Sequence, residues 1–205
     1  MAITAAMVKE LREMTGAGMM DCKKALTETN GDMDAAVDVL KKSGAAKMEK
    51  KQSRIAAEGI ARVAVNGNVA VVAEVNSETD FVAKNETFQE FVQTVADTAL
   101  ASDLNGGANG EDIEALLATN GLSDLLVEKT ATIGEKLSVR RFAKVTGDAV
   151  ASYIHGGGRI GVVIAADGAS DDAAKEALTN IAMQVAAMNP QYISRNDMSA
   201  EELAK

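Results

Sequence analysis

The sequence predicts an α+β protein: an N-terminal three-helix domain, then a core of two similar α+β subdomains with antiparallel strands. Two observations support this. Apolar residues recur with helical spacing up to Leu40, whereas strict alternation begins at Ile60. A pattern of two strands followed by a helix then occurs twice. The 205 residues are 47% hydrophobic and 25% charged, a composition typical of globular domains.

Three short helices are expected in residues 1–42, which form the first predicted domain. Thr4 and Asp32 are the predicted N-caps of the first and third helices, and Gly31 follows the second. The apolar faces of the first two helices are predicted from spacing: Met7, Val8, Leu11 and Met14, then Met20, Cys22, Ala25 and Leu26. The third helix is expected to end near Leu40, and residues 43–54 are interpreted as a basic, partly helical linker.

Residues 55–147 are expected to form the first core subdomain. Strands at Ile60–Val65 and Val69–Val75 flank Asn66-Gly67, which predicts a two-residue hairpin turn. Thr87-Phe88-Gln89-Glu90 predicts a capping box that opens a helix to about Ala101. Short helices around 113–118 and 124–133 and a strand at 137–145 are expected to complete this subdomain.

Residues 148–205 are expected to form the second core subdomain, with strands at 150–154 and 159–166 and a helix at 171–188. The apolar spacing of the two subdomain helices matches: Phe88, Phe91, Val92 and Val95 against Leu178, Ile181, Ala182 and Val185. A second capping box, Ser199-Ala200-Glu201-Glu202, comes just before the last residue. We therefore expect this subdomain to be incomplete, in a fragment or a short form of a longer protein.

Composition and motifs argue against several functional classes. The net charge of -9 disfavours nucleic acid and anionic membranes as partners. The single cysteine, Cys22, excludes an intramolecular disulfide and a thiolate zinc cage. Gly156-Gly157-Gly158-Arg159-Ile160-Gly161 fits a dinucleotide-binding pattern, but a strand follows it where that fingerprint needs a helix. No catalytic residue, cofactor or metal site is expected, and without a signal peptide or long apolar span the cytoplasm is the expected location.

Phe81 lies in the polar segment Thr79–Asn85, beside Asp80. The corresponding place in the second subdomain, Gly168–Asp172, holds only a turn and a helix cap, so the segment is not needed to form the fold. Two interpretations stay open from the residues. Phe81 folds back onto the adjoining helix as part of the core, or it is presented for insertion into a pocket of a partner.

Several segments together resemble a known family: Thr79–Asn85, Val8–Leu26, Ile133–Arg141, His155–Val162 and Ile181–Ala187. They are spread over nearly the whole chain and resemble bacterial translation elongation factor Ts. The resemblance implies a guanine nucleotide exchange factor that binds the GTPase elongation factor Tu in its GDP-bound and nucleotide-free forms. It also implies that the N-terminal helices form a ubiquitin-associated-like domain, and that the factor performs no covalent chemistry.

The resemblance assigns roles to individual residues. Thr79, Asp80, Phe81 and Val82 correspond to the segment that dislodges Mg²⁺ from the partner's nucleotide site. Secondary partner contacts are expected at Met19, Met20, Lys23 and His155. The alternatives are packing within the bundle for the two methionines, a solvated face for Lys23 and an ordinary turn-proximal histidine for His155. Whether the protein forms a homodimer, or a heterotetramer with its partner, stays open.

Two other functions are weighed against nucleotide exchange. One is a ubiquitin-associated-type adaptor that binds a partner without changing its nucleotide. The other is a small α/β enzyme that uses Cys22 or His155.

Overall fold

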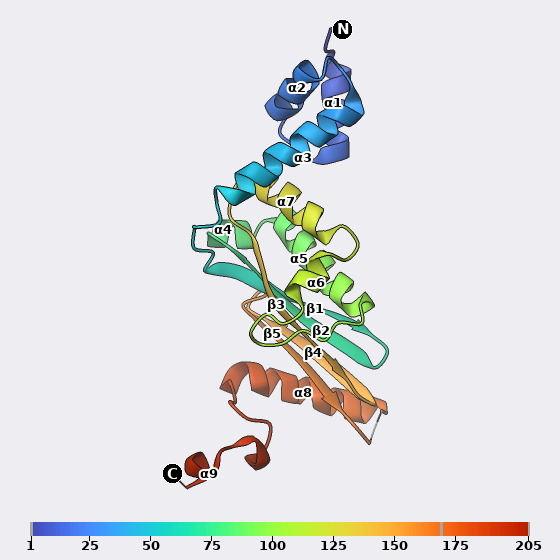
Figure 1. Ribbon diagram of the computed structural model, residues 1–205. Coiled ribbons are helices and arrows are strands. Elements are labelled where there is room, and N and C mark those ends of the chain that lie inside the picture. The colour runs from blue at the N-terminus through green and yellow to red at the C-terminus, as the bar shows by residue number, and fades with distance from the viewer. Residues whose placement is uncertain (1, 169, 205) are drawn as a thin grey trace.

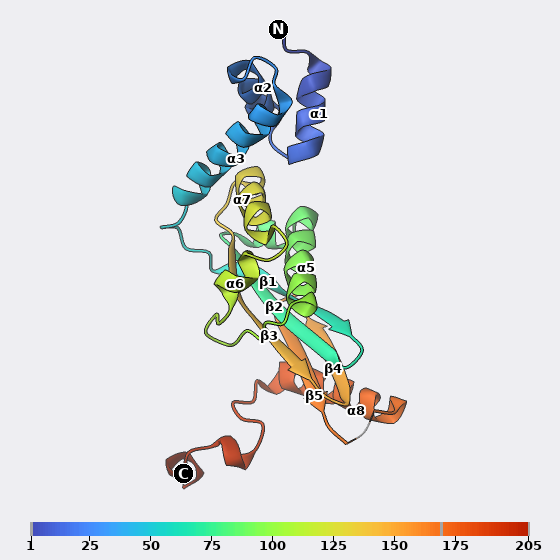
Figure 2. The same ribbon diagram turned by 45° about the vertical axis from the view of Figure 1, so that its right-hand side comes forward.

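The computed structural model describes residues 2–168 and 170–204, in which an N-terminal helical bundle is followed by two stacked antiparallel sheets with helices on their outer faces (Figure 1). The helices α5–α7 cover one side of the stack and α8 covers the other (Figures 1 and 2). The α+β class with antiparallel strands is therefore confirmed.

The bundle consists of α1 (Ala5–Thr15), α2 (Met19–Glu28) and the first half of α3 (Met33–Glu49). Both predicted caps are confirmed: Thr4 Oγ1 accepts the Met7 N–H at 3.3 Å, and Asp32 Oδ1 accepts the Ala35 N–H at 3.0 Å. Small and medium apolar side chains fill the bundle core: Val8, Leu11, Cys22, Ala25, Leu26 and Ala36.

The predicted apolar faces of the first two helices are wrong at Met14 and Met20. Their exposed fractions are 57% and 77%. Three short helices enclose a narrow interior, so only the central positions of each apolar face are covered.

Helix α3 continues to Glu49, well past the end expected near Leu40. Gly44 is buried against α7, where a Cβ at this position would come within 3.1 Å of Val127 Cγ1. This tertiary contact supports helix where the basic stretch alone gave little apolar signal. The helix therefore runs through the boundary predicted between residues 42 and 43.

The first sheet has the order β1 (Glu58–Asn66), β2 (Val69–Ser77), β3 (Ser138–Thr146), with both pairs antiparallel. Asn66 pairs with Val69, so the hairpin turn is Gly67-Asn68, one residue later than predicted. Gly67 has φ +58°, the positive value that a two-residue hairpin favours at its first turn position.

Helix α5 (Glu86–Ala101) packs on this sheet, and its predicted apolar face is confirmed by the burial of Phe88, Phe91, Val92 and Val95. The predicted capping box at Thr87 is wrong. Asn85 is the N-cap, and its Oδ1 accepts the Phe88 N–H at 3.2 Å. Because Asn85 comes two residues earlier, Thr87 already lies within the first helical turn. Helices α6 (Ile113–Leu117) and α7 (Leu122–Ile133) complete the layer.

The second sheet contains β4 (Ala149–His155) and β5 (Ile160–Ala166) and packs face to face on the first. A Cβ at Gly161 would lie 2.9 Å from both Ala61 Cβ and Val72 Cγ2. The glycine is thus needed for close approach of the two sheets. The prediction of a hairpin at Gly156–Gly158 is confirmed, because a strand follows it.

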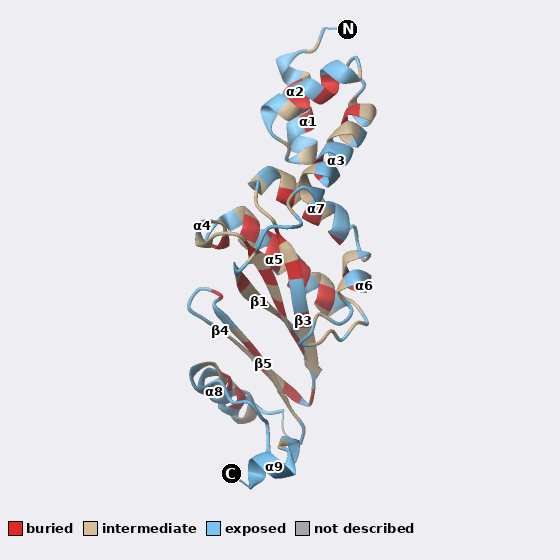
Figure 3. Ribbon diagram, turned by 60° about the vertical axis from the view of Figure 1, so that its left-hand side comes forward, coloured by how far each residue is buried: buried red, intermediate tan, exposed pale blue. Residues whose placement is uncertain are grey.

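Helix α8 (Asp172–Met188) covers the outer face of the second sheet. Leu178 and Ala182 are buried, but Ile181 is 50% exposed, unlike Phe91, the corresponding residue of α5. The two strands described here offer α8 a narrower face than the three that α5 covers, and much of α8 is exposed in Figure 3.

A short 3₁₀ helix (Arg195–Asp197) and α9 (Ala200–Leu203) follow α8. The capping box predicted at Ser199 is confirmed. Across the described residues, 2–168 and 170–204, no helix combines the length and apolar character that a membrane crossing requires.

Candidate functional site

Phe81 lies on α4 (Asp80–Ala83), a single helical turn between β2 and α5. Thr79 is its N-cap, and Thr79 Oγ1 accepts the Val82 N–H at 3.4 Å. Val82 and Ala83 pack in the main core, the apolar interior between the first sheet and helices α5–α7, whereas Phe81 is 81% exposed. Successive helical residues are rotated by about 100°, so burying Val82 and Ala83 turns Phe81 outward. The interpretation of Phe81 as a core residue is therefore wrong.

A charged pair flanks Phe81 along the chain. Asp80 Oδ2 lies 2.7 Å from Lys84 Nζ, one helical turn further along the chain. The hydrogen bond from Lys84 and its positive charge lower the pKa of Asp80, with a smaller contribution from Arg159. Phe81 is therefore presented next to an ionised carboxylate.

A second carboxylate forms hydrogen bonds with the residues just before α4. Glu135 Oε2 accepts the backbone N–H groups of Glu78 and Thr79, each at 3.0 Å. Glu135 Oε1 accepts the hydroxyl proton of Thr79 at 2.6 Å. Glu135 follows Gly134, the C-cap of α7, and so comes from a part of the chain more than fifty residues away.

The contact is reciprocal. Glu78 Oε1 accepts the Lys136 N–H at 2.6 Å and pairs with Arg54 Nη1 at 3.2 Å. The Lys136 hydrogen bond is the main reason that the pKa of Glu78 is lowered, and the Arg54 side chain adds to it. We refer to Glu78, Thr79, Glu135 and Lys136 as the clamp.

Sequence reasoning missed the clamp. Glu135 and Lys136 lie in the Ile133–Arg141 segment that carried the resemblance, but no local pattern connects them to Thr79. Lys136 Nζ also donates to the carbonyl oxygens of Gln52 and Arg54, at 2.6 and 2.9 Å. The segment between α3 and β1 is thereby joined to the clamp.

The turn that follows His155 lies at the same end of the first sheet as α4. The Gly158 carbonyl accepts the Ala61 N–H on β1 at 2.7 Å, and Glu58 of the same strand pairs with Ser77, just before the clamp. Figure 3 shows this turn reaching toward α4. His155 is exposed, and its Nδ1 lies 2.9 Å from the Tyr153 hydroxyl.

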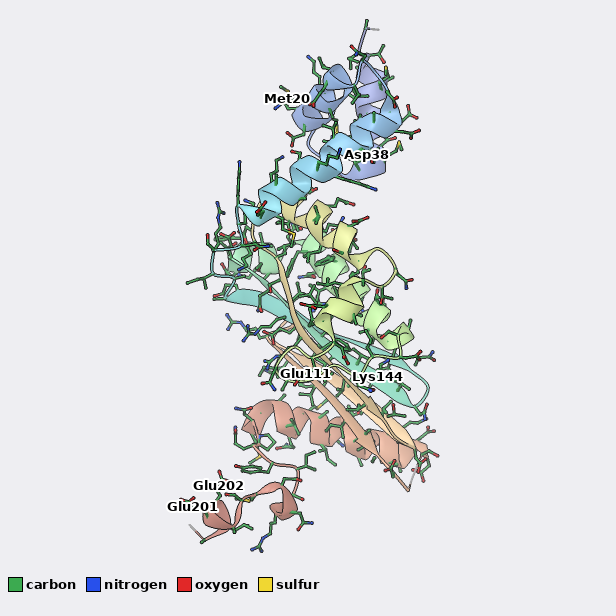
Figure 4. The ribbon with its side chains drawn as sticks, viewed as in Figure 1. Met20, Asp38, Glu111, Lys144, Glu201 and Glu202 are labelled. Atoms are coloured by element: carbon green, nitrogen blue, oxygen red, sulfur yellow. The ribbon has the colours of Figure 1, made fainter. Side chains whose placement is uncertain are left out.

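The three candidate residues of α2 lie elsewhere, on the N-terminal bundle. Met19 and Met20 are 59% and 77% exposed, so packing within the bundle does not account for them. Lys23 is exposed one turn further on. Figure 4 places Met20 on the bundle, well separated from the end of the sheet where α4 lies.

Helices α2 and α4 present exposed apolar side chains at the surface. Cys22 is fully buried, and burial raises the pKa of its thiol, which disfavours the thiolate that nucleophilic catalysis needs. Among the residues that the structure describes, no three His, Cys, Asp or Glu side chains gather as a metal site. The arrangement suits contact with another macromolecule.

A comparison with protein families agrees with this geometry. The family described as Elongation factor TS matches residues 78–205, which is more than half of the chain. The match begins at Glu78 of the clamp and includes α4, Glu135 and the turn after His155. The protein therefore belongs to the elongation factor Ts family.

Proposed function

We propose that this protein is a guanine nucleotide exchange factor for elongation factor Tu. It binds the GDP-bound GTPase, disturbs its Mg²⁺ and phosphate site, and promotes GDP release for exchange with GTP. Membership of the elongation factor Ts family supports a nucleotide exchange role in translation. The observation that carries the finer proposal is Phe81, 81% exposed on a short turn held by the clamp.

Energetics limit the role of Phe81. A nucleotide held at nanomolar strength carries about 12 kcal/mol of binding free energy. Burying one phenylalanine returns only about 1.5–3 kcal/mol. Phe81 therefore acts as a trigger that distorts the nucleotide site while a wider interface holds the partner. Coupling is reciprocal: the factor weakens GDP binding as much as GDP weakens binding of the factor.

Other surfaces supply that wider interface. The N-terminal bundle acts as a ubiquitin-associated-like docking domain through Met19, Met20 and Lys23, and His155 contributes a contact from the second subdomain. Thr79, Asp80 and Val82 shape the turn around Phe81. The factor works in the cytoplasm and performs no covalent chemistry, and neither nucleic acid nor a membrane is its partner.

Release of fluorescent GDP from elongation factor Tu tests the proposal. The wild-type chain accelerates release, and Phe81→Ala lowers the maximal rate at saturating factor about tenfold, as loss of roughly 1.4 kcal/mol implies. The control is Val65→Ala. It removes another exposed apolar side chain, at the end of β1 that is far from α4, and is expected to leave the rate unchanged.

The same assay separates exchange from simple binding. A chain that binds the GTPase without accelerating GDP release would be an adaptor, and the exchange proposal would be abandoned. Wild-type exchange by Phe81→Ala would refute the role of the exposed ring.

A further inference from the structure

We infer that Glu135 is a positioning residue, which orients the Phe81 turn so that nucleotide release on the partner depends on it. The inference rests on the proposed function, since it concerns the residue that sets the geometry of Phe81. Glu135 itself is half-buried behind the turn and acts through the backbone that carries Phe81.

The Phe81 turn needs support from outside itself. Helix α4 has four residues, too few to be stable in isolation. With its ring exposed, Phe81 contributes little packing that would fix the turn. The orientation of the ring therefore depends on how the chain enters α4 after Ser77, at Glu78 and Thr79.

Glu135 fixes that entry through three hydrogen bonds. Its carboxylate accepts two consecutive backbone N–H groups, at Glu78 and Thr79. It also accepts the Thr79 hydroxyl proton at 2.6 Å. Because the hydroxyl proton points toward Glu135, a lone pair of Thr79 Oγ1 is left to accept the Val82 N–H and cap α4. The carboxylate thus orients both the entering backbone and the cap.

The support comes from rigid elements. Glu135 is placed between the end of α7 and the start of β3, both of which contribute to the main core. The neighbouring Lys136 N–H returns a hydrogen bond to Glu78, which closes the clamp from the other side. A preorganised side chain binds with less ordering cost than a mobile one, so the clamp prepares Phe81 for insertion.

Three substitutions separate hydrogen-bond geometry from charge. Glu135→Ala removes all the acceptors. Glu135→Gln loses the charge, but one amide oxygen can accept both backbone N–H groups and the amide nitrogen can donate to Thr79 Oγ1. Glu135→Asp keeps the charge but is one methylene too short to reach all three donors. A positioning role predicts wild-type behaviour for Glu135→Gln and impairment for Glu135→Ala and Glu135→Asp. A role for the charge itself predicts impairment for Glu135→Gln and wild-type behaviour for Glu135→Asp.

Glu111→Ala is the matched control. Glu111 Oε2 also accepts a backbone N–H in a loop, from Asn109 at 2.9 Å. Figure 4 places Glu111 beside the first sheet, away from α4.

The first measurement needs no partner. Hydrogen exchange of the Glu78 and Thr79 amides, followed by NMR, is expected to accelerate about tenfold or more in Glu135→Ala and Glu135→Asp. It is expected to stay near wild type in Glu135→Gln and Glu111→Ala. Unchanged protection of these amides in both Glu135→Ala and Glu135→Asp would overturn the inference.

The second measurement is a double-mutant cycle on GDP release. Glu135→Ala is expected to lower the maximal rate about fivefold alone and to cause no further loss in a Phe81→Ala background, as coupled residues do. Two results would overturn the inference while the proposed function stands. One is an equal loss of rate from Glu135→Ala in the wild-type and Phe81→Ala backgrounds. The other is a normal rate in Glu135→Ala although the Glu78 and Thr79 amides exchange freely. If Phe81→Ala alone accelerates GDP release as fast as wild type does, the role of the exposed ring is refuted and the inference falls with it. The exchange proposal itself fails only if the wild-type chain does not accelerate release.

Discussion

Phe81 and Phe88 are seven residues apart and have opposite environments. Phe88 is completely buried against the first sheet, while Phe81 is 81% exposed. Both lie just after a helix N-cap, so their position relative to the cap does not explain the difference. The difference arises because α5 turns Phe88 toward the sheet, whereas α4 buries Val82 and Ala83 instead.

This contrast predicts opposite effects on stability. Phe81→Ala is expected to change the free energy of unfolding by less than about 0.5 kcal/mol, as for other exposed sites. Phe88→Ala is expected to cost about 3–5 kcal/mol, because it leaves a cavity in the main core. Chemical denaturation measures both. A large loss in Phe81→Ala would show that the ring packs against the protein in solution.

Glu78 links the clamp to pH. The hydrogen bond from the Lys136 N–H, and then Arg54, lower the pKa of Glu78 in the folded protein. Because the pKa of Glu78 is lower in the folded than in the unfolded protein, its ionisation stabilises the fold at pH values above the ordinary glutamate pKa of about 4.3. That contribution is lost as the pH falls further, through the lowered value.

The expected result is a pH-dependent difference between wild type and Glu78→Gln. Wild type should be the more stable near pH 6, and its advantage should shrink as the pH is lowered to about 3. Urea denaturation at several pH values measures the two free energies of unfolding. A difference that stays constant with pH would mean that the clamp does not hold Glu78 in its ionised form.

At the scale of elements, tertiary contacts set helix ends that local signals placed elsewhere. Helix α3 extends to Glu49 where Gly44 packs against Val127 of α7. Helix α5 begins after Asn85, although the residues from Thr87 to Glu90 match the capping-box pattern. A motif shows that a cap is possible, and the position of the helix on the sheet selects which cap is used.

The two caps can be told apart by substitution. Asn85→Ala is expected to lower the free energy of unfolding by about 1 kcal/mol, because the Phe88 N–H loses its acceptor. The neighbouring Thr87→Ala serves as the control and is expected to cost less than about 0.5 kcal/mol. The opposite ranking, measured by thermal or chemical unfolding, would restore the capping box.

At the scale of the molecule, the two sheets, each with the helices on its outer face, have unequal interiors. The first encloses three aromatic side chains: Phe88, Phe91 and Phe142. The buried core of the second is a small cluster of Ala149, Ala151 and Leu178. Its sheet also lies against the first sheet, so it depends on that contact as well as on α8.

Unequal cores predict unequal local stability. Backbone amides of β4, β5 and α8 are expected to exchange with solvent at least about tenfold faster than those of β2 and α5, because less apolar area protects them. Hydrogen exchange resolved by segment tests this. Equal protection in both sets of elements would indicate a single cooperative unit.

Local sequence predicted much of this protein. The period of apolar residues identified the strands and most of the helices, and Thr4, Asp32 and Ser199 were identified as caps. The strand that follows Gly156–Gly158 distinguishes this hairpin from a dinucleotide-binding motif, in which a helix would follow. These features depend on the backbone preferences of residues that are adjacent in the chain, so a short stretch of sequence is enough to predict them.

Sequence by itself left the exposure of Phe81 open. Its prediction that residues 79–85 are not needed to form the fold is wrong, because Ala83 is buried in the main core and Asn85 caps α5. Tertiary structure decided that exposure, the length of α3, and the clamp that joins Glu135 to Thr79 across more than fifty residues. The physical reason is that burial and long-range hydrogen bonds depend on which elements pack together. No periodicity along the chain determines where two segments so far apart will meet.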